Sequence, residues 1–214
     1  MTTNFFIAPS RRGFLLAGGA TIALAGCSGM IGPGAAPQLY VLRPNLGPLA
    51  DAPSLDWTLT IALPSAPLSL DTARIALQRT PDTMDYYANA AWQDRAPVLV
   101  QRALLEAFEK SGKIAAVAGD TEGVRADYLL QTDLRAFEAR YPTPDATPEI
   151  VVDIVARLLR TPGRKIAATL EDRKTAEAGA NSVPAVVAAF DSASAAAVEA
   201  IVAWALKAPE PDKA

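Results

Sequence analysis

Hydrophobic and polar residues alternate along two long runs of the chain, and this period of two predicts strands with one buried and one wet face. In residues 126–138 the predicted buried positions are Leu130, Thr132, Leu134 and Ala136, and the wet ones are Gln131, Asp133 and Arg135. The next run buries Ile150, Val152, Ile154, Ala156 and Leu158 and exposes Asp153 and Arg157. The turn-forming residues Tyr141-Pro142-Thr143-Pro144 between the runs predict a hairpin.

Shorter runs predict five further strands, at residues 57–63, 73–79, 84–87, 114–118 and 164–171. Turns are expected at 80–82 and 161–163, which hold proline or glycine next to polar residues. The polar stretch 172–181 shows no alternation, so we expect it to lie outside the strands.

Two segments have the spacing of helices that bury one face. The first is expected to use Asp94 as its cap, to hold Pro97 in its first turn and to end at Gly112. The second begins with Ser182 as its cap and Pro184 in its first turn. Its apolar stripe consists of Val183, Val187, Phe190, Ala197, Ile201 and Trp204.

These elements predict an α/β (α+β) sandwich, in which two helices pack on one face of a mixed, largely antiparallel sheet. Each half of the chain has three strands followed by a helix. The pattern therefore leaves two architectures open, namely two βββα-like halves from an internal duplication, or a single irregular sandwich.

An uncharged apolar stretch, residues 14–25, precedes the single cysteine of the chain, Cys27. With Arg11 and Arg12 before it, the stretch has the form of an export signal, and it is shorter than the about 20 residues that a membrane span requires. Leu24, Ala25 and Gly26 complete a lipobox, in which small residues admit the signal peptidase and the thiol accepts a diacylglycerol. We therefore predict that Cys27 is the lipid attachment site, in preference to a buried small hydrophobic residue.

The predicted organisation is a signal peptide at 1–26, a lipidated N-terminus with a flexible tether at 27–38, a single folded domain at 39–207 and a disordered tail at 208–214. The signal peptide resembles the twin-arginine type. Its removal takes away two arginines, so the mature chain is more acidic than the formal −3 of the full sequence, which argues against a nucleic-acid partner. A diacylglycerol and an N-acyl chain on Cys27 are expected to anchor the protein in the membrane. Neither a metal nor a further cofactor is expected.

Catalytic motifs are sparse. The chain has no histidine, which removes the commonest general base and metal ligand, and its only thiol is assigned to lipid. Ser111-Gly112-Lys113 lacks the upstream glycine of a phosphate-binding loop. Asp127 and Asp133 could share one strand face, but a solvated face explains them better, and Trp57, Trp92 and Trp204 are expected in the core.

A series of short motifs follows the predicted tether in a set order. They are Leu39-Tyr40-Val41-Leu42, Ile61-Ala62-Leu63-Pro64, the run 73–79, Met84-Asp85-Tyr86-Tyr87, Trp92, the helix 97–108 and the strand 128–138. In this order they resemble the auxiliary lipoproteins of ABC-type transport systems that work with mammalian-cell-entry (MCE) proteins. The resemblance spans nearly the whole mature chain.

The resemblance implies a non-catalytic component of a system that moves lipid between the membranes of a Gram-negative cell. It implies a lipid anchor at the periplasmic face of the outer membrane, with the inner membrane as the alternative. The implied partners are an MCE-domain periplasmic protein and, indirectly, its permease and ATPase. Whether the protein forms a homo-oligomer is left open. Two other functions are considered, a structural envelope lipoprotein without a transport role and an anchored envelope hydrolase.

Overall fold

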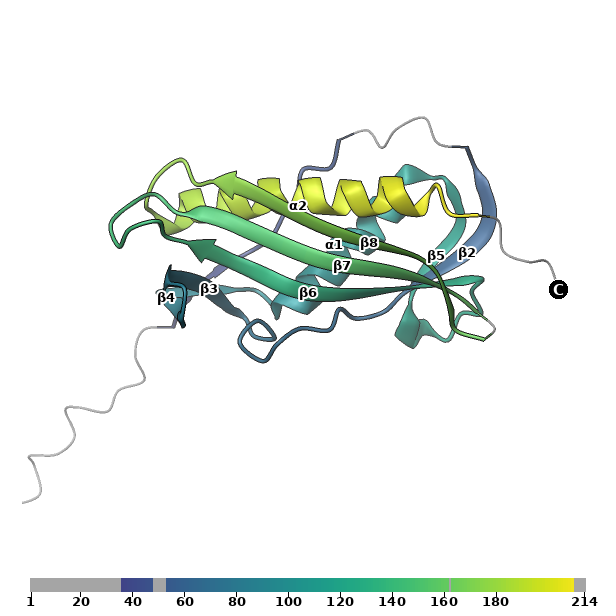
Figure 1. Ribbon diagram of the computed structural model, residues 1–214, viewed down its shortest axis with the longest axis horizontal. Coiled ribbons are helices and arrows are strands. Elements are labelled where there is room, and N and C mark those ends of the chain that lie inside the picture. The colour runs from purple at the N-terminus through teal and green to yellow at the C-terminus, as the bar shows by residue number, and fades with distance from the viewer. Residues whose placement is uncertain (1–35, 48–52, 162, 210–214) are drawn as a thin grey trace, which may run out of the picture. The chain divides into compact units, whose positions relative to one another are not determined.

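The strands β6 (Tyr128–Arg140), β7 (Glu149–Arg160) and β8 (Lys165–Glu177) run side by side as an antiparallel meander (Figure 1). The computed structural model describes residues 36–47, 53–161 and 163–209, and those from Pro37 onward belong to one compact unit. Along β6, Leu130 and Leu134 are buried whereas Arg135 is exposed. The predicted alternation therefore describes most of this strand correctly.

The second edge of β6 is divided between two other strands. β2 (Leu55–Ile61) pairs with it in parallel at Tyr128–Leu130, and β3 (Arg74–Thr80) does so at 138–140. Between them, Ser65 donates its backbone N–H to Thr132 and accepts that of Leu134. Because both edges of β6 are paired, β6 is the central strand of the sheet.

Three further strands widen the sheet on the side of β2 and β3. β4 (Thr83–Trp92) is antiparallel to β3, β1 (Gln38–Tyr40) is parallel to β4, and β5 (Ile114–Gly119) is parallel to β2. The resulting mixed sheet has eight strands among the described residues, and β7 and β8 extend it from the other side of β6.

Both helices lie behind the sheet in the view of Figure 1. α1 (Ala96–Ser111) packs on β5 and β2, and α2 (Val183–Ala205) packs on β7 and β8 and touches α1. Each helix has a proline in its first turn, where no backbone donor is needed, and α1 ends at Gly112 in the left-handed conformation (φ 59°). A 3₁₀ turn, η1 (Asp120–Glu122), links β5 to the approach of β6.

α2 is long and apolar enough to cross a membrane by length and composition, with a mean hydropathy of 1.7. However, 61% of that apolar window is buried inside the domain. This degree of burial is typical of a core helix, whose apolar residues face other protein elements.

The segment that follows β1 is fastened to α2 by two carboxylates. The backbone N–H of Arg43 donates to Asp191 Oδ1 at 2.7 Å, and the backbone N–H of Gly47 donates to Glu199 Oε1 at 2.6 Å. The N-terminal part of the domain is therefore held on the helix as well as on the sheet.

Aromatic side chains join the two layers. The ring centroids of Trp92 and Phe190 lie 5.2 Å apart, and those of Phe137 and Phe190 lie 4.8 Å apart. Trp57 packs edge-on against Tyr128 at 5.0 Å. The prediction that Trp57 and Trp92 are core residues is confirmed, since each is 1% exposed, and Trp204 packs on the core while partly exposed.

The predicted fold class is confirmed: two helices cover a mixed sheet. The pairing differs between the two halves of the chain, however. β6, β7 and β8 are sequential neighbours, whereas β2 and β3 are not paired with each other and both join β6. The two halves thus share an order of elements but not an arrangement of strands.

Three local predictions were wrong. β8 continues to Glu177, through residues expected outside the strands, because it pairs with β7 along its whole length. β4 continues to Trp92, past Asn89, whose positive φ of 55° interrupts the alternation. A bulge shifts the register of β6 after Leu134, but Ala136 is buried as predicted, with 4% of its surface exposed. The first helix is capped at Arg95 rather than at Asp94, whose side chain accepts the Arg95 N–H at 2.7 Å.

Candidate functional site

The residues that the sequence assigns to lipid attachment lie outside the described residues. They are Cys27, the lipobox residues Leu24, Ala25 and Gly26, and the signal residues Arg11 and Arg12. Their roles therefore stay predictions, and the site described below belongs to the folded domain.

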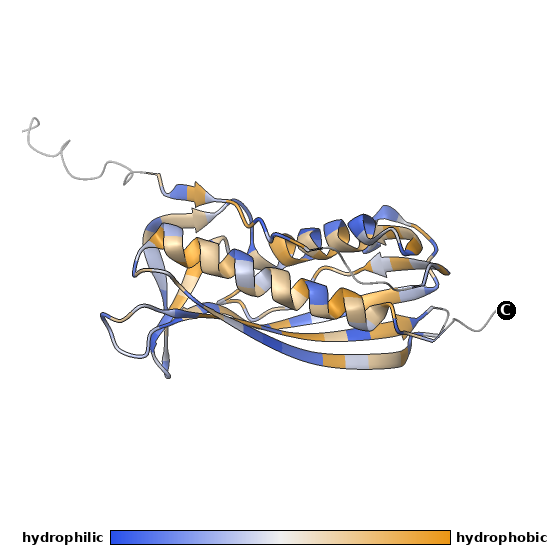
Figure 2. Ribbon diagram, turned by 90° about the horizontal axis from the view of Figure 1, so that it is seen from above, coloured by the Kyte–Doolittle hydropathy of each residue, from blue (hydrophilic) through white to orange (hydrophobic). Residues whose placement is uncertain are grey.

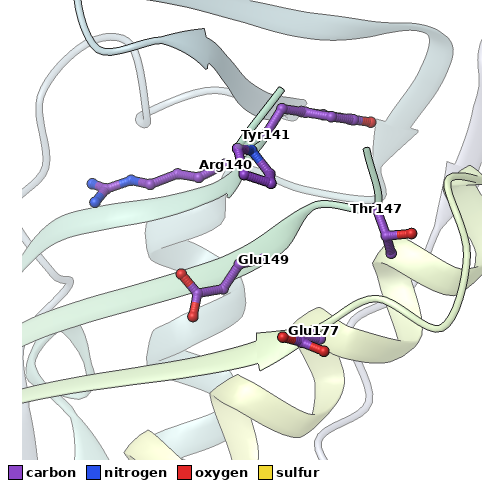
Figure 3. A pocket seen from close by; sticks show the side chains of 6 residues that line it. Arg140, Tyr141, Thr147, Glu149 and Glu177 are labelled. Carbon is purple, nitrogen blue, oxygen red and sulfur yellow. The ribbon is translucent and has the colours of Figure 1, made fainter. Parts of the chain in front are cut away.

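An open recess of about 500 Å³ lies at the end of the sheet where β6 leads into β7 (Figure 3). Its lining comes from the end of β6, the start of β7 and the end of β8, and consists of Arg140, Tyr141, Pro142, Thr147, Glu149 and Glu177. A second recess of about 290 Å³ shares Arg140, Tyr141 and Pro142 and reaches the β3–β4 hairpin at residues 78–81. Three strand ends and a hairpin, far apart in sequence, therefore meet at this end of the domain.

Arg140 is held at the recess by a buried carboxylate. Its Nε and Nη2 atoms lie 2.9 Å and 2.7 Å from Glu138 Oε1, and the Glu138 side chain is only 4% exposed. The two residues are two positions apart on β6, so both side chains leave the same face of the strand. The pair fixes the guanidinium and balances a carboxylate that is almost fully removed from water.

Tyr141 points to the opposite side of the chain from Arg140 (Figure 3) and joins two other elements. Its hydroxyl lies 2.7 Å from that of Tyr87 on β4 and 2.9 Å from Asn181 Oδ1, just before α2. Since Asn181 Oδ1 can only accept, Tyr141 donates to it and Tyr87 donates to Tyr141. Burial and this hydrogen bond raise the pKa of Tyr87 far above its ordinary value, so Tyr87 stays a neutral donor.

Glu149 and Glu177 stand directly opposite each other on β7 and β8, and both are exposed. Like charges in such a cross-strand pair repel. Arg140, which stands opposite Glu149 on the other side, makes its described ion pair with Glu138 instead. The recess therefore offers two carboxylates to a basic group.

The carboxylates considered as a catalytic pair have separate partners. Asp127 accepts hydrogen bonds from the backbone N–H and the hydroxyl of Thr58, at 2.8 Å and 2.9 Å. Asp133 accepts the Ser65 hydroxyl at 3.1 Å and lies 3.6 Å from Arg135 Nε. Within the described residues, no group of three or more acidic, cysteine or histidine side chains is arranged to hold a metal ion. The two carboxylates thus bind different groups, and each connects β6 or its approach to a neighbouring segment of the sheet.

Comparison with known proteins identifies the family. The model of the ABC-type transport auxiliary lipoprotein component matches residues 40–202. The chain belongs to this family. A crystal structure of a family-related protein, XCC0632 from Xanthomonas campestris, has 31% identity and a TM-score of 0.74, covering 79% of this chain and 94% of that one. A second, uncharacterised structure shares the fold at 12% identity, with a TM-score of 0.62 over 80% of this chain and 99% of that one.

A curated relative is an uncharacterised protein of Bradyrhizobium diazoefficiens, which is 33% identical over 186 residues. The alignment covers 85% of this chain and 48% of that protein, so the chain spans about half the length of the curated relative.

The site residues of this transport auxiliary lipoprotein were not singled out by the sequence reading. Glu138 and Arg140 follow the two-residue spacing of a strand face and carry opposite charges, which is the one local signal that could have indicated the pair. The partners of Tyr141 are 54 and 40 positions away, so no local pattern points to them.

Proposed function

We propose that the protein is a non-catalytic lipoprotein of an ABC/MCE-type transport system, which docks a periplasmic MCE-domain partner at the outer membrane while lipid or a related apolar substrate moves between the membranes. Membership of the ABC-type transport auxiliary lipoprotein family supports the transport part of this proposal.

The observation that carries the docking role is the character of the recess. It is open, its lining side chains other than Pro142 carry a charge or a hydroxyl group, and the ion pair with the buried Glu138 fixes its arginine. Such a surface suits contacts with the polar rim of another protein better than enclosure of a lipid tail, which calls for apolar lining. We therefore assign lipid transfer to the partner, and we assign to this protein the positioning of that partner.

The outer membrane is proposed from Ser28, since in enterobacteria an aspartate at this position retains lipoproteins in the inner membrane. The anchor would be the acylated Cys27. Mass spectrometry of the mature protein should find residue 27 at the N-terminus carrying lipid, and an unmodified thiol in a chain that begins at Met1 would overturn this assignment.

The partner is tested by crosslinking in cells followed by affinity purification of the lipoprotein. An MCE-domain protein should be recovered repeatedly, and recovery of its permease and ATPase at lower yield would fit an indirect contact. The matched control is Cys27→Ala, which should fold normally but fail to complement a deletion strain. Full complementation by this unlipidated form, or repeated recovery of no MCE-domain protein, would contradict the proposal.

A further inference from the structure

The outer edge of β8 carries no strand among the described residues. β8 is thirteen residues long, and its only partner among the described strands is β7, so within this part of the chain its other edge presents unpaired backbone N–H and C=O groups. α2 packs on β8 from behind and reaches past this edge (Figure 1), and no element lies in front of α2 when it is viewed from that side (Figure 2). A strand added to β8 would therefore find a helix already beneath it.

The uncovered part of α2 is made of small residues. Ala188 and Ser192 are exposed and Ala185 is half-buried. Together with Glu177, Gly179 and Ala189, these three residues line a cavity of about 290 Å³. We call the free edge of β8 with this part of α2 the β8 groove. Its small side chains leave room for the inward side chains of a ninth strand, which stand perpendicular to the sheet.

A buried acceptor on β8 lacks a donor. Asp172 stands opposite Ile154, a core residue, so its side chain is on the helix side of the sheet. It is 9% exposed, and Lys174 Nζ lies 2.7 Å from its Oδ1, while its Oδ2 is buried without a hydrogen-bond partner among the described residues. A buried carboxylate oxygen without a donor is costly, and a neighbouring strand could supply one.

Charges on the other face of β8 alternate in sign. Glu171, Arg173 and Glu177 share this face. Glu177 and Glu149 repel each other, so a cation at the end of β8 would be stabilising. Charged edges resist uncontrolled strand pairing, so a partner must bring the complementary charges.

We propose that the β8 groove is the docking site for an extended segment of another protein, which adds a ninth, antiparallel strand to the sheet. The segment carries a basic residue opposite Glu177, an acidic one opposite Arg173, a hydroxyl donor opposite Asp172, and aliphatic side chains toward α2. The inference stands apart from the transport role, because each of its observations concerns β8 and α2 and none involves the identity of the transporter.

The probe is the synthetic peptide Lys-Val-Thr-Val-Glu-Thr-Lys-Val-Thr, whose first residue would stand opposite Glu177. The control peptide exchanges its lysines and glutamate. With the purified full-length protein in detergent, the matched peptide should slow hydrogen exchange of the β8 amides and bind at least about fivefold more tightly than the control peptide, because three cross-strand charge pairs change sign. Equal binding of both peptides, or no protection of β8, would overturn the proposal.

Two variants locate the binding. Glu177→Lys should reduce the preference for the matched peptide, and Ala188→Phe, an exposed position, should weaken binding by filling the cavity floor. Ala116→Phe on the exposed part of β5 is the matched control and should bind normally. Circular dichroism checks that each variant is folded. If hydrogen exchange of β8 slowed with rising protein concentration in the absence of peptide, a second copy of the protein would be the occupant. If Ala188→Phe bound the peptide as tightly as the wild type, the peptide would lie elsewhere. Either result would overturn the proposal.

Discussion

The carboxylate of Asp191 on α2 accepts the backbone N–H of Arg43 at 2.7 Å, across 148 positions of sequence. This bond ties the segment that follows β1 to the last helix of the domain. Burial raises the pKa of Asp191, and the hydrogen bond from Arg43 opposes part of that rise. The surroundings of Asp191 therefore favour its neutral carboxyl over the carboxylate. The contribution of Asp191 to the stability of the domain should then depend on pH.

The sign of this dependence can be predicted. A raised pKa means that the folded chain binds the proton more tightly than the unfolded chain, so the free energy of unfolding falls as pH rises through the raised pKa. In Asp191→Asn the amide oxygen accepts the same bond without charge, and this fall should disappear. Urea unfolding of the wild type and the variant from about pH 4 to pH 7 measures how the free energy of unfolding changes with pH. A variant profile parallel to that of the wild type would contradict the prediction. Asp191→Ala also lacks the titrating carboxyl, so its profile should lose the same pH dependence and should lie about 1 kcal/mol below that of Asp191→Asn through loss of the acceptor.

Arg140→Ala should lower the free energy of unfolding by about 3 kcal/mol, because it leaves the Glu138 carboxylate, 4% exposed, without its cation. The control is Arg95→Ala, which breaks an equally short ion pair of 2.7 Å with Asp71 whose side chains are 46% and 31% exposed. Screening by water should keep the cost of this control below about 1 kcal/mol. Chemical denaturation compares the two.

A double variant separates charge from packing at the same place. Glu138→Leu combined with Arg140→Met removes both charges and keeps the side-chain bulk, so it should recover most of the stability lost in Arg140→Ala. Equal losses in the single variants Arg140→Ala and Arg95→Ala would show that burial of Glu138 does not govern the cost.

Tyr141→Phe should destabilise the domain more than Tyr87→Phe. The first change removes the hydroxyl that both accepts from Tyr87 and donates to Asn181, while the second removes one donor only. We expect losses of about 2 kcal/mol and about 1 kcal/mol, because the first change removes two part-buried hydrogen bonds and the second removes one. Thermal unfolding of both variants provides the comparison, and the reverse order would refute the assigned direction of the hydrogen bonds.

Gly112→Ala should cost about 1 kcal/mol, because Gly112 ends α1 with φ at +59°, a conformation that disfavours a Cβ. Gly179 is the matched control, since neither glycine has an atom within 4 Å of an added Cβ and Gly179 has no positive φ. Gly179→Ala should be neutral or stabilising by about 0.5 kcal/mol, through the lower entropy of the unfolded chain. If both variants lose the same stability, backbone strain is not the cause at Gly112.

Local patterns predicted the parts of the fold in which one face is buried. Leu130 and Leu134 alternate with more exposed residues because helices cover only one side of β6. The alternation of apolar and polar residues in the sequence shows this directly. The end of β8 has no such signature, since Asp172 and Lys174 put polar groups on its helix side as well. Its strand conformation comes from pairing with β7, a contact between residues 149 and 177 that local composition cannot indicate.

The candidate sites divide in the same way. The role predicted for Cys27 rests on adjacent residues alone, because a signal peptidase would read a short linear motif. The recess depends on the meeting of strand ends, and Glu138 looks like an ordinary wet-face residue until its neighbours show that it is 3% exposed. Burial of a charged residue is a property of the assembled fold, and for this reason its role emerged only from the structure.

The order in which the chain enters the domain also determines how it would bear a pull. β1 is parallel to β4, so tension on the N-terminal side slides Gln38, Leu39 and Tyr40 along β4 and loads their hydrogen bonds together instead of peeling them one by one. Behind them, the bonds of Arg43 and Gly47 to α2 would have to break before the strain reached the core. With the lipid anchor proposed at Cys27, a pull on this end would therefore meet the β1–β4 hydrogen bonds first and the two bonds to α2 next, before it strained the core.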